Sequence, residues 1–183
     1  MKKLILFTIL TLSFSCNAQI YPLTATELPE NSYRKDINND LQAFEGTWKG
    51  TWKEKTFLIN FKKIVNQYDN ILKIYIDRLI GKFQVKDSNG NILFDNLNLA
   101  DNKAKIEGGK IFPSGKYTLS YVDPDLCLKS GGIMINFTNP NKTELKLKFY
   151  ETSQVLDSEC FYHGKPIDQR PEPIPQEIIL TKQ

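Results

Sequence analysis

The sequence has little of the material from which catalytic and metal sites are usually built. It contains a single histidine, His163, and three cysteines among 183 residues. A structural metal site takes about four ligands, and a nucleophilic triad needs a base beside a serine or cysteine. His163 is the only histidine that could serve as this base, and the chain contains no G-x-S-x-G motif around a nucleophilic serine. We therefore predict no catalytic residues, no metal ligands and no cofactor, and a protein that is not an enzyme.

An excess of charge of one sign is also missing. The chain has 24 Lys and Arg against 21 Asp and Glu, a formal net charge of +3. Loss of Lys2 and Lys3 with an N-terminal leader would leave 22 basic against 21 acidic residues. Nucleic-acid binding calls for a basic excess or a basic stripe, so no nucleic-acid partner is predicted.

No apolar run reaches the ~20 residues that a transmembrane helix needs. A shorter run stands at the N-terminus, where the chain opens MKKLILFTILTL. Two lysines followed by a short apolar stretch are typical of a secretory signal peptide. We expect the protein to be exported, with a signal peptide over residues 1–15 or, alternatively, over residues 1–18.

The two boundaries correspond to two kinds of cleavage at LSFSCNAQ, residues 12–19. A small residue before Cys16 suits a lipoprotein signal peptidase, which leaves Cys16 as the lipid-bearing first residue. Small residues ending in Ala18 suit a general signal peptidase, which leaves Gln19 first. The first reading predicts a membrane-anchored lipoprotein of the cell envelope, with residues 16–36 as a polar tether and residues 37–183 as the folded domain. The second predicts a periplasmic or secreted protein.

Either cleavage leaves Cys127 and Cys160 as the remaining pair of cysteines. In an oxidising compartment two such thiols most simply form one disulfide. The alternative is two free thiols.

Alternation of apolar and polar residues, the pattern of a half-buried strand, recurs along most of the chain. It is clear over 57–61, 117–121, 133–137 and 145–149. About nine short strands in meander order, preceded by one short helix at 39–44, predict an all-β fold. Such an arrangement is either a sandwich or a barrel.

The phase of the alternation slips within one long predicted strand. Ile74 and Ile76 occupy even positions, whereas Leu79 and Phe83 occupy odd ones. The slip predicts a β-bulge near Asp77, where the strand bends. A bent long strand favours closure into a single antiparallel meander β-barrel.

The stretch FEGTWKG, residues 44–50, places Gly46-Thr47-Trp48 after a short helix and at the start of the first long strand. This resembles the N-terminal signature of lipocalin-like (calycin-like) barrels, in which the tryptophan packs across the closed end. The resemblance implies a barrel in which Trp48 and Trp52 line or close a ligand cavity. The alternative is an ordinary core tryptophan.

A wider resemblance runs from about Asp36 to the C-terminus. The order DxNNxLxxFxGTWKGTW, xIDxLIGxFxVxDSNG, LNLxDxKAKIxG, DPxLC, a second cysteine and PxEIILTKQ resembles an uncharacterised family of small exported Bacteroidota proteins. The resemblance implies export, often with a lipid anchor, and a β-rich fold. It implies no activity.

Two functions are compatible with these features. The first is a non-catalytic envelope protein that binds a small apolar or amphipathic ligand inside the barrel, since barrels of about eight strands can hold one ligand. The second is a structural or protein-interaction lipoprotein with a packed barrel and no ligand. Its partner would be an envelope protein, docked on the outer face or on a proline-rich strap at residues 164–175. A ligand-sized cavity favours the first, and a packed interior with an exposed apolar patch favours the second.

Overall fold

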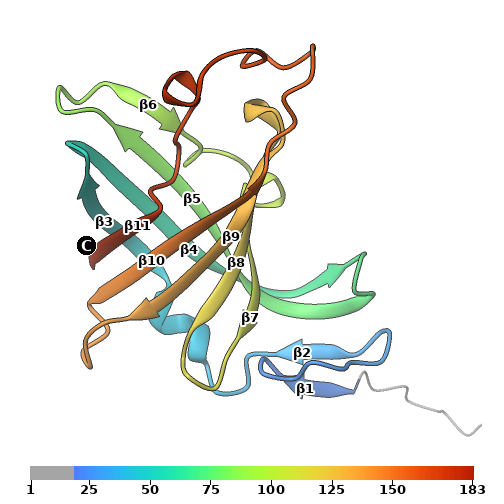
Figure 1. Ribbon diagram of the computed structural model, residues 1–183. Helices are drawn as coiled ribbons and strands as arrows, with labels where there is room; N and C mark the ends of the chain where they lie inside the picture. The colour runs from blue at the N-terminus through green and yellow to red at the C-terminus, as the bar shows by residue number, and fades with distance from the viewer. Residues whose placement is uncertain (1–18) are drawn as a thin grey trace, which may run out of the picture.

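The computed structural model describes residues 19–183, so the predicted signal peptide and Cys16 lie outside the described residues (Figure 1). The described chain forms strands and short 3-10 helices. In chain order they are β1 (Ile20–Pro22), β2 (Tyr33–Lys35), η1 (Asp40–Phe44), β3 (Gly46–Trp52), β4 (Lys55–Asp69), β5 (Ile74–Lys86), β6 (Ile92–Asp95), η2 (Asp101–Lys103), β7 (Ile106–Ile111), β8 (Tyr117–Asp123), η3 (Pro124–Leu126), β9 (Lys129–Phe137), β10 (Glu144–Ser153), η4 (Ile167–Gln169) and β11 (Glu177–Lys182).

Eight strands close into a barrel in the order β4-β3-β11-β10-β9-β8-β7-β5, and all neighbours around the ring are antiparallel. The last strand, β11, pairs with the first barrel strand, β3. The ring closes between β5 and β7, where Ile80 pairs with Glu107 and Gly81 with Ile106. This confirms the predicted all-β, lipocalin-like barrel.

Three further strands lie outside the ring, which brings the described total to eleven rather than about nine. β6 pairs with β5 after the turn at residues 87–91. β1 and β2 add to the free edge of β5 in parallel, with Ile20 opposite Tyr33 and Tyr33 opposite Tyr75. Six residues of the predicted tether at 16–36 form these two strands, Ile20–Pro22 and Tyr33–Lys35. The helix predicted at 39–44 is present as the 3-10 helix η1, Asp40–Phe44.

The predicted bulge is present, but its extra residue belongs to the partner strand. Between the pairs Ile64–Arg78 and Gln67–Ile76, two residues of β4 lie opposite Asp77 alone. One of them, Asn66, has a positive φ of 53°. The alternation in β5 slips because both Asp77 and Arg78 are buried and each is held by polar partners.

One continuous core fills the barrel. Every barrel strand contributes inward-facing side chains that are at most 6% exposed. They are Trp48, Phe57, Ile59, Phe61, Leu79, Phe83, Val85, Ile106, Ile111, Tyr117, Leu119, Tyr121, Ile133, Ile135, Leu145, Leu147, Phe149, Ile178 and Leu180. Leu41 and Phe44 of η1 join this core at one end, and Ile174 joins it from the C-terminal strap.

The hairpin formed by β4 and β5 is longer than the barrel. β3 pairs with β4 only as far as Phe61, and the β4–β5 ladder continues to Asp69 opposite Ile74. The end of this hairpin projects past η1, beside β1 and β2 (Figure 1). The turn between β3 and β4 lies at the opposite end, where Lys53 pairs with Glu172 of the strap at 3.0 Å.

Candidate functional site

Trp48 closes one end of the barrel instead of lining an open cavity. Its side chain is fully buried, and its indole Nε1 donates a hydrogen bond to the Phe44 carbonyl at 2.8 Å. The Phe137 ring centroid lies 6.1 Å away, and the Lys182 ammonium lies 5.3 Å from the indole centroid. Phe44, the last residue of η1, stacks on the same Phe137 ring with centroids 4.4 Å apart, so η1 and Trp48 close this end together.

Trp52, the second predicted ligand residue, lies near the other end of β3. It lies four residue steps along the strand from Trp48, about 13 Å, so the two indoles do not form one site. Trp52 is partly buried and packs edge-to-face on Phe57 at 6.1 Å. Its indole Nε1 is buried and has no hydrogen-bond partner among the described residues.

The larger hollows of the described chain lie outside the barrel core. One of about 580 Å³ lies under the strap. Its wall includes the ion pairs Lys129–Glu151 and Lys53–Glu172, so it is unsuited to an apolar ligand. Another, of about 360 Å³, lies on the outer face of β3, β4 and β5 and contains Lys62. The interior itself is occupied by side chains.

The predicted strap at 164–175 is fixed to its own barrel. Pro173, Ile174 and Pro175 are buried, and Ile174 belongs to the barrel core. The prolines hold an extended backbone that places Ile174 over the end of the barrel away from Trp48. Pro173, Ile174 and Pro175 are therefore already used within the chain, whereas Ile167 of the same strap remains exposed.

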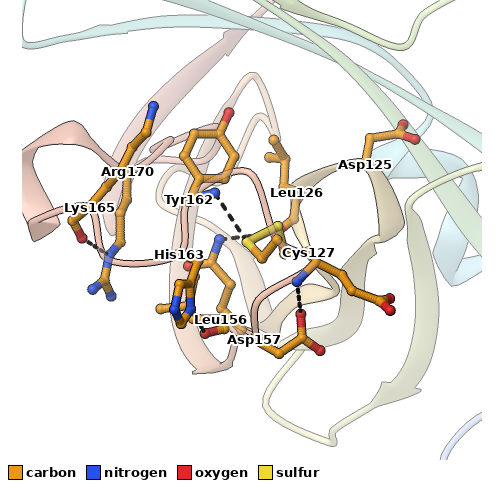
Figure 2. Close-up of a disulfide and its surroundings, with 12 residues drawn as sticks. Asp125, Leu126, Cys127, Leu156, Asp157, Tyr162, His163, Lys165 and Arg170 are labelled. Carbon is orange, nitrogen blue, oxygen red and sulfur yellow. Dashed lines mark hydrogen bonds between the residues drawn. A yellow bond between two sulfur atoms is a disulfide. The ribbon is translucent and has the colours of Figure 1, made fainter.

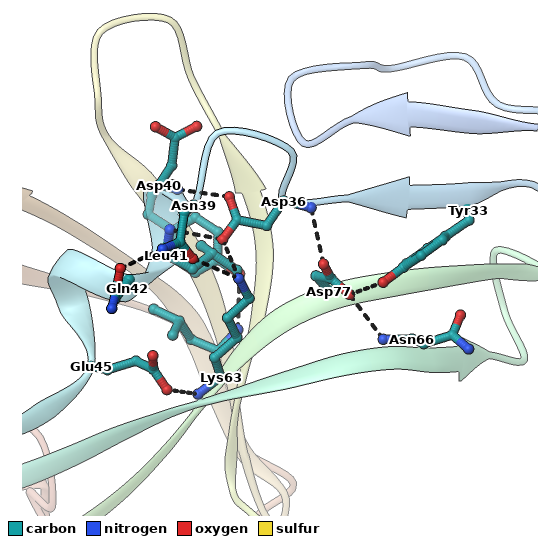
Figure 3. Close-up of polar contacts among 12 residues, drawn as sticks. Tyr33, Asp36, Asn39, Asp40, Leu41, Gln42, Glu45, Lys63, Asn66 and Asp77 are labelled. Carbon is teal, nitrogen blue, oxygen red and sulfur yellow. Dashed lines mark hydrogen bonds and ion pairs between the residues drawn. The ribbon is translucent and has the colours of Figure 1, made fainter.

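The most densely bonded polar cluster lies at the closed end (Figure 3). The buried Asp77 carboxylate accepts hydrogen bonds from the Tyr33 hydroxyl at 2.5 Å and from the backbone N–H groups of Asn66 at 2.9 Å and Asp36 at 3.0 Å. A bulge leaves a backbone N–H without a ladder partner, and Asp77 satisfies that of Asn66. Burial, followed by the contact with Asp77, raises the pKa of Tyr33 well above its ordinary value.

Asp36 extends the cluster to η1. Its carboxylate accepts from the backbone N–H groups of Asp40 at 2.7 Å and Leu41 at 3.2 Å, and it pairs with Lys63 at 2.6 Å. It therefore caps the start of η1, where backbone N–H groups need acceptors. Both carboxylates are consumed by structural contacts that join β2, β4, β5 and η1. Sequence reasoning missed this cluster, although the polar Asp77 within an apolar strand was a signal.

Substitution of Asp77 by asparagine tests this structural role. The amide would turn an NH2 group toward at least one of the three donors that the carboxylate now accepts from. An unsatisfied buried donor costs ~1–3 kcal/mol, so we expect chemical denaturation to show a loss of stability of that size. Tyr33→Phe removes only one donor and should cost less. A D77N protein as stable as the wild type would contradict the role assigned to Asp77.

Polar side chains also complete the short β5–β7 seam. The pairing of β5 with β7 ends at Ile80. The backbone N–H of the preceding residue, Leu79, donates instead to the Tyr117 hydroxyl at 3.2 Å. A Cβ on Gly108 would lie 2.0 Å from that hydroxyl, so glycine is required there. Burial raises the pKa of Tyr117 to about 12, so the hydroxyl stays neutral even at pH values where an exposed tyrosine would ionise.

Cys127 and Cys160 form the predicted disulfide, with Cα atoms 5.6 Å apart (Figure 2). It joins the end of η3 to the loop after β10. The ring Nδ1 of His163 lies 2.8 Å from the Leu156 carbonyl. The nearest cysteine in sequence, Cys160, is oxidised and cannot act as a nucleophile. These contacts give His163 a structural role in the loop.

Metal-binding clusters and membrane-spanning helices are both absent over residues 19–183. In that range no group of three or more His, Cys, Asp or Glu side chains is placed to hold a metal ion. Within the same residues, no helix has both the length and the apolar character needed to cross a membrane.

Comparison with known proteins places the chain in a family. Residues 1–183 match the model of the family of unknown function DUF6705 over their full length. The chain belongs to that family. No curated protein and no solved structure matches it. Membership agrees with the predicted resemblance to an uncharacterised family and carries no activity with it.

Proposed function

We propose that this protein is a non-catalytic protein exported to the cell envelope, held to a membrane through lipid on Cys16, whose barrel is a packed scaffold and not a ligand carrier. The observation that supports the scaffold role is the continuous core, in which side chains from all eight barrel strands are at most 6% exposed. The polar capping clusters and the strap further stabilise this fold.

Two features support export and anchoring. The N-terminal sequence has a signal-peptide pattern ending at Cys16. The Cys127–Cys160 disulfide is typical of oxidising compartments outside the cytosol. In this proposal the functional surface is on the outside of the barrel, and its partners lie in the envelope.

A ligand carrier is the competing proposal, and binding of a fluorescent fatty-acid analogue distinguishes the two. The packed scaffold predicts no saturable one-to-one binding and no change in Trp48 emission. Saturable binding that quenches Trp48 and is abolished by an Ile135→Trp substitution in the core would overturn the scaffold and support the carrier. The thermal midpoint of I135W must be measured alongside, because overpacking costs ~1–3 kcal/mol.

A further inference from the structure

The projecting end of the β4–β5 hairpin exposes apolar side chains to solvent. Ile71 is 91% exposed, Val65 62% and Leu72 50%. Turn positions in water are usually polar, so two consecutive aliphatic residues at a hairpin tip need a reason. We call residues 65–75 of this hairpin the tip.

The tip is rigid in its backbone. The Asp69 carboxylate accepts from the N–H groups of Ile71 at 3.0 Å and Leu72 at 2.9 Å, and the Lys73 N–H donates to the Asp69 carbonyl at 2.7 Å. Burial of Asp69 opposes its ionisation, but the hydrogen bonds from Arg78 and from the turn outweigh burial and lower its pKa. These hydrogen bonds hold the turn so that Ile71 and Leu72 face outward.

Aromatic rings lie directly behind the aliphatic tip. Tyr68 and Tyr75 have ring centroids 5.1 Å apart and are 42% and 36% exposed. Tyrosines concentrate at the boundary between lipid headgroups and acyl chains. The two charged residues of the tip are both neutralised by partners, Lys73 by Glu30 at 2.8 Å and Asp69 by Arg78 at 2.5 Å. The surface is therefore an apolar point with an aromatic border and little net charge.

The first described strand, β1, lies beside the tip. Ile20, itself 53% exposed, lies opposite Tyr33, and Tyr33 lies opposite Tyr75. Two strand spacings place Ile20 about 10 Å from Tyr75. Cys16 precedes Ile20 by four residues, which span at most ~14 Å. A lipid on Cys16 would therefore enter a bilayer next to the tip.

We propose that the tip inserts Ile71 and Leu72 into the interfacial layer of a lipid bilayer and so fixes the orientation of the anchored barrel. The proximity of the lipid rests on the proposed function, but the affinity of the tip for a bilayer does not. Anchored this way, the barrel presents its strap and disulfide end away from the membrane, toward partners in the aqueous space.

The test uses residues 17–183, from which Cys16 is omitted, and anchors them artificially. The result is then independent of native lipidation. An N-terminal hexahistidine tag binds the chain to phosphatidylcholine vesicles that contain a nickel-chelating lipid. Ile71→Trp reports on the tip, and Ile167→Trp is the matched control, because Ile167 is 81% exposed in the strap at the opposite end. Lipids brominated in their acyl chains quench indoles that enter the bilayer.

Trp48 and Trp52 also fluoresce, so the emission of the anchored wild type is subtracted from that of each variant. We expect the emission added by I71W to shift to shorter wavelength on anchoring and to be quenched several-fold more than that added by I167W. Adding Leu72→Asp to I71W should remove most of that quenching, because a carboxylate resists transfer into the apolar layer. Equal quenching of I71W and I167W would overturn the proposal and assign the tip to a protein partner. Thermal midpoints equal to that of the wild type establish that each variant is folded.

Failure of the proposed function has a different signature. If the native protein carries no lipid on Cys16, its intact mass shows this directly, whatever the quenching result. Strong I71W quenching with an unlipidated native chain would retain the tip as a membrane-binding element and discard the anchor. Lipidation without I71W quenching would retain the anchor and discard the tip.

Discussion

Replacing Trp48 with alanine is expected to lower the free energy of unfolding by ~3–5 kcal/mol. The indole is fully buried where η1 closes the barrel, so its removal would leave a cavity. The Phe44 carbonyl would also lose the hydrogen bond that it accepts from Nε1. The surrounding Phe137 and Lys182 pack on the ring and would lose their contacts. Denaturant titration with a two-state fit measures this loss.

Trp52→Ala is the matched control for this prediction. It removes an equal volume from the same strand, but Trp52 is only partly buried and its Nε1 has no partner among the described residues. We expect a clearly smaller loss than for Trp48→Ala. A Trp48→Ala protein as stable as the wild type would contradict both the core position of Trp48 and its role in closing one end of the barrel.

Serine at Cys127 or Cys160 is expected to destabilise the protein by ~3–4 kcal/mol in the chain-entropy account of disulfides. The two cysteines are 33 residues apart, and the loop they close contains β9 and β10. Without the disulfide the unfolded chain gains freedom that the native fold must overcome. Thermal unfolding under non-reducing conditions should show a lower midpoint for each variant.

Both single substitutions should resemble the double substitution, because each one removes the same bond. Reduced wild-type protein should melt close to the variants, which separates loss of the bond from loss of side-chain packing. A double variant that melts like the oxidised wild type would show that the disulfide adds no stability.

Much of the fold was predictable because its signals are local. Alternation marks the inward faces of the long strands, and Gly46-Thr47-Trp48 marks the first barrel strand. The cysteine count pointed to Cys127 and Cys160, which the structure joins. Each of these signals depends on residues whose partners are specified by period, by count or by a short motif.

Other features were not predictable because they depend on distant partners. β1 and β2 are three residues long and pair in parallel, so they leave no period in the sequence. The phase slip at Asp77 located the bulge but not its strand, since the extra residue is Asn66 on β4. The tip was not predicted, because the exposure of Ile71 depends on the length by which the β4–β5 hairpin extends beyond the barrel.

The two ends of the barrel carry different features. η1 and the tip lie at the end of the barrel where β1 and β2 add to the sheet (Figure 1). Trp48 and the Asp36–Asp77 cluster lie at the same end, because Trp48 and Asp36 each bond to residues of η1 and Asp36 bonds to Asp77. The strap and the disulfide loop occupy the other end. An anchored scaffold needs this polarity, because one end must face the membrane while the other remains available to partners.

The intact mass of the native protein, recovered from its membrane fraction, tests the central claim of an anchored scaffold most directly. The account predicts a polypeptide that begins at Cys16 and carries a diacyl or triacyl group. A polypeptide that begins at Gln19 without lipid would contradict the anchor and indicate a freely diffusing periplasmic or secreted protein.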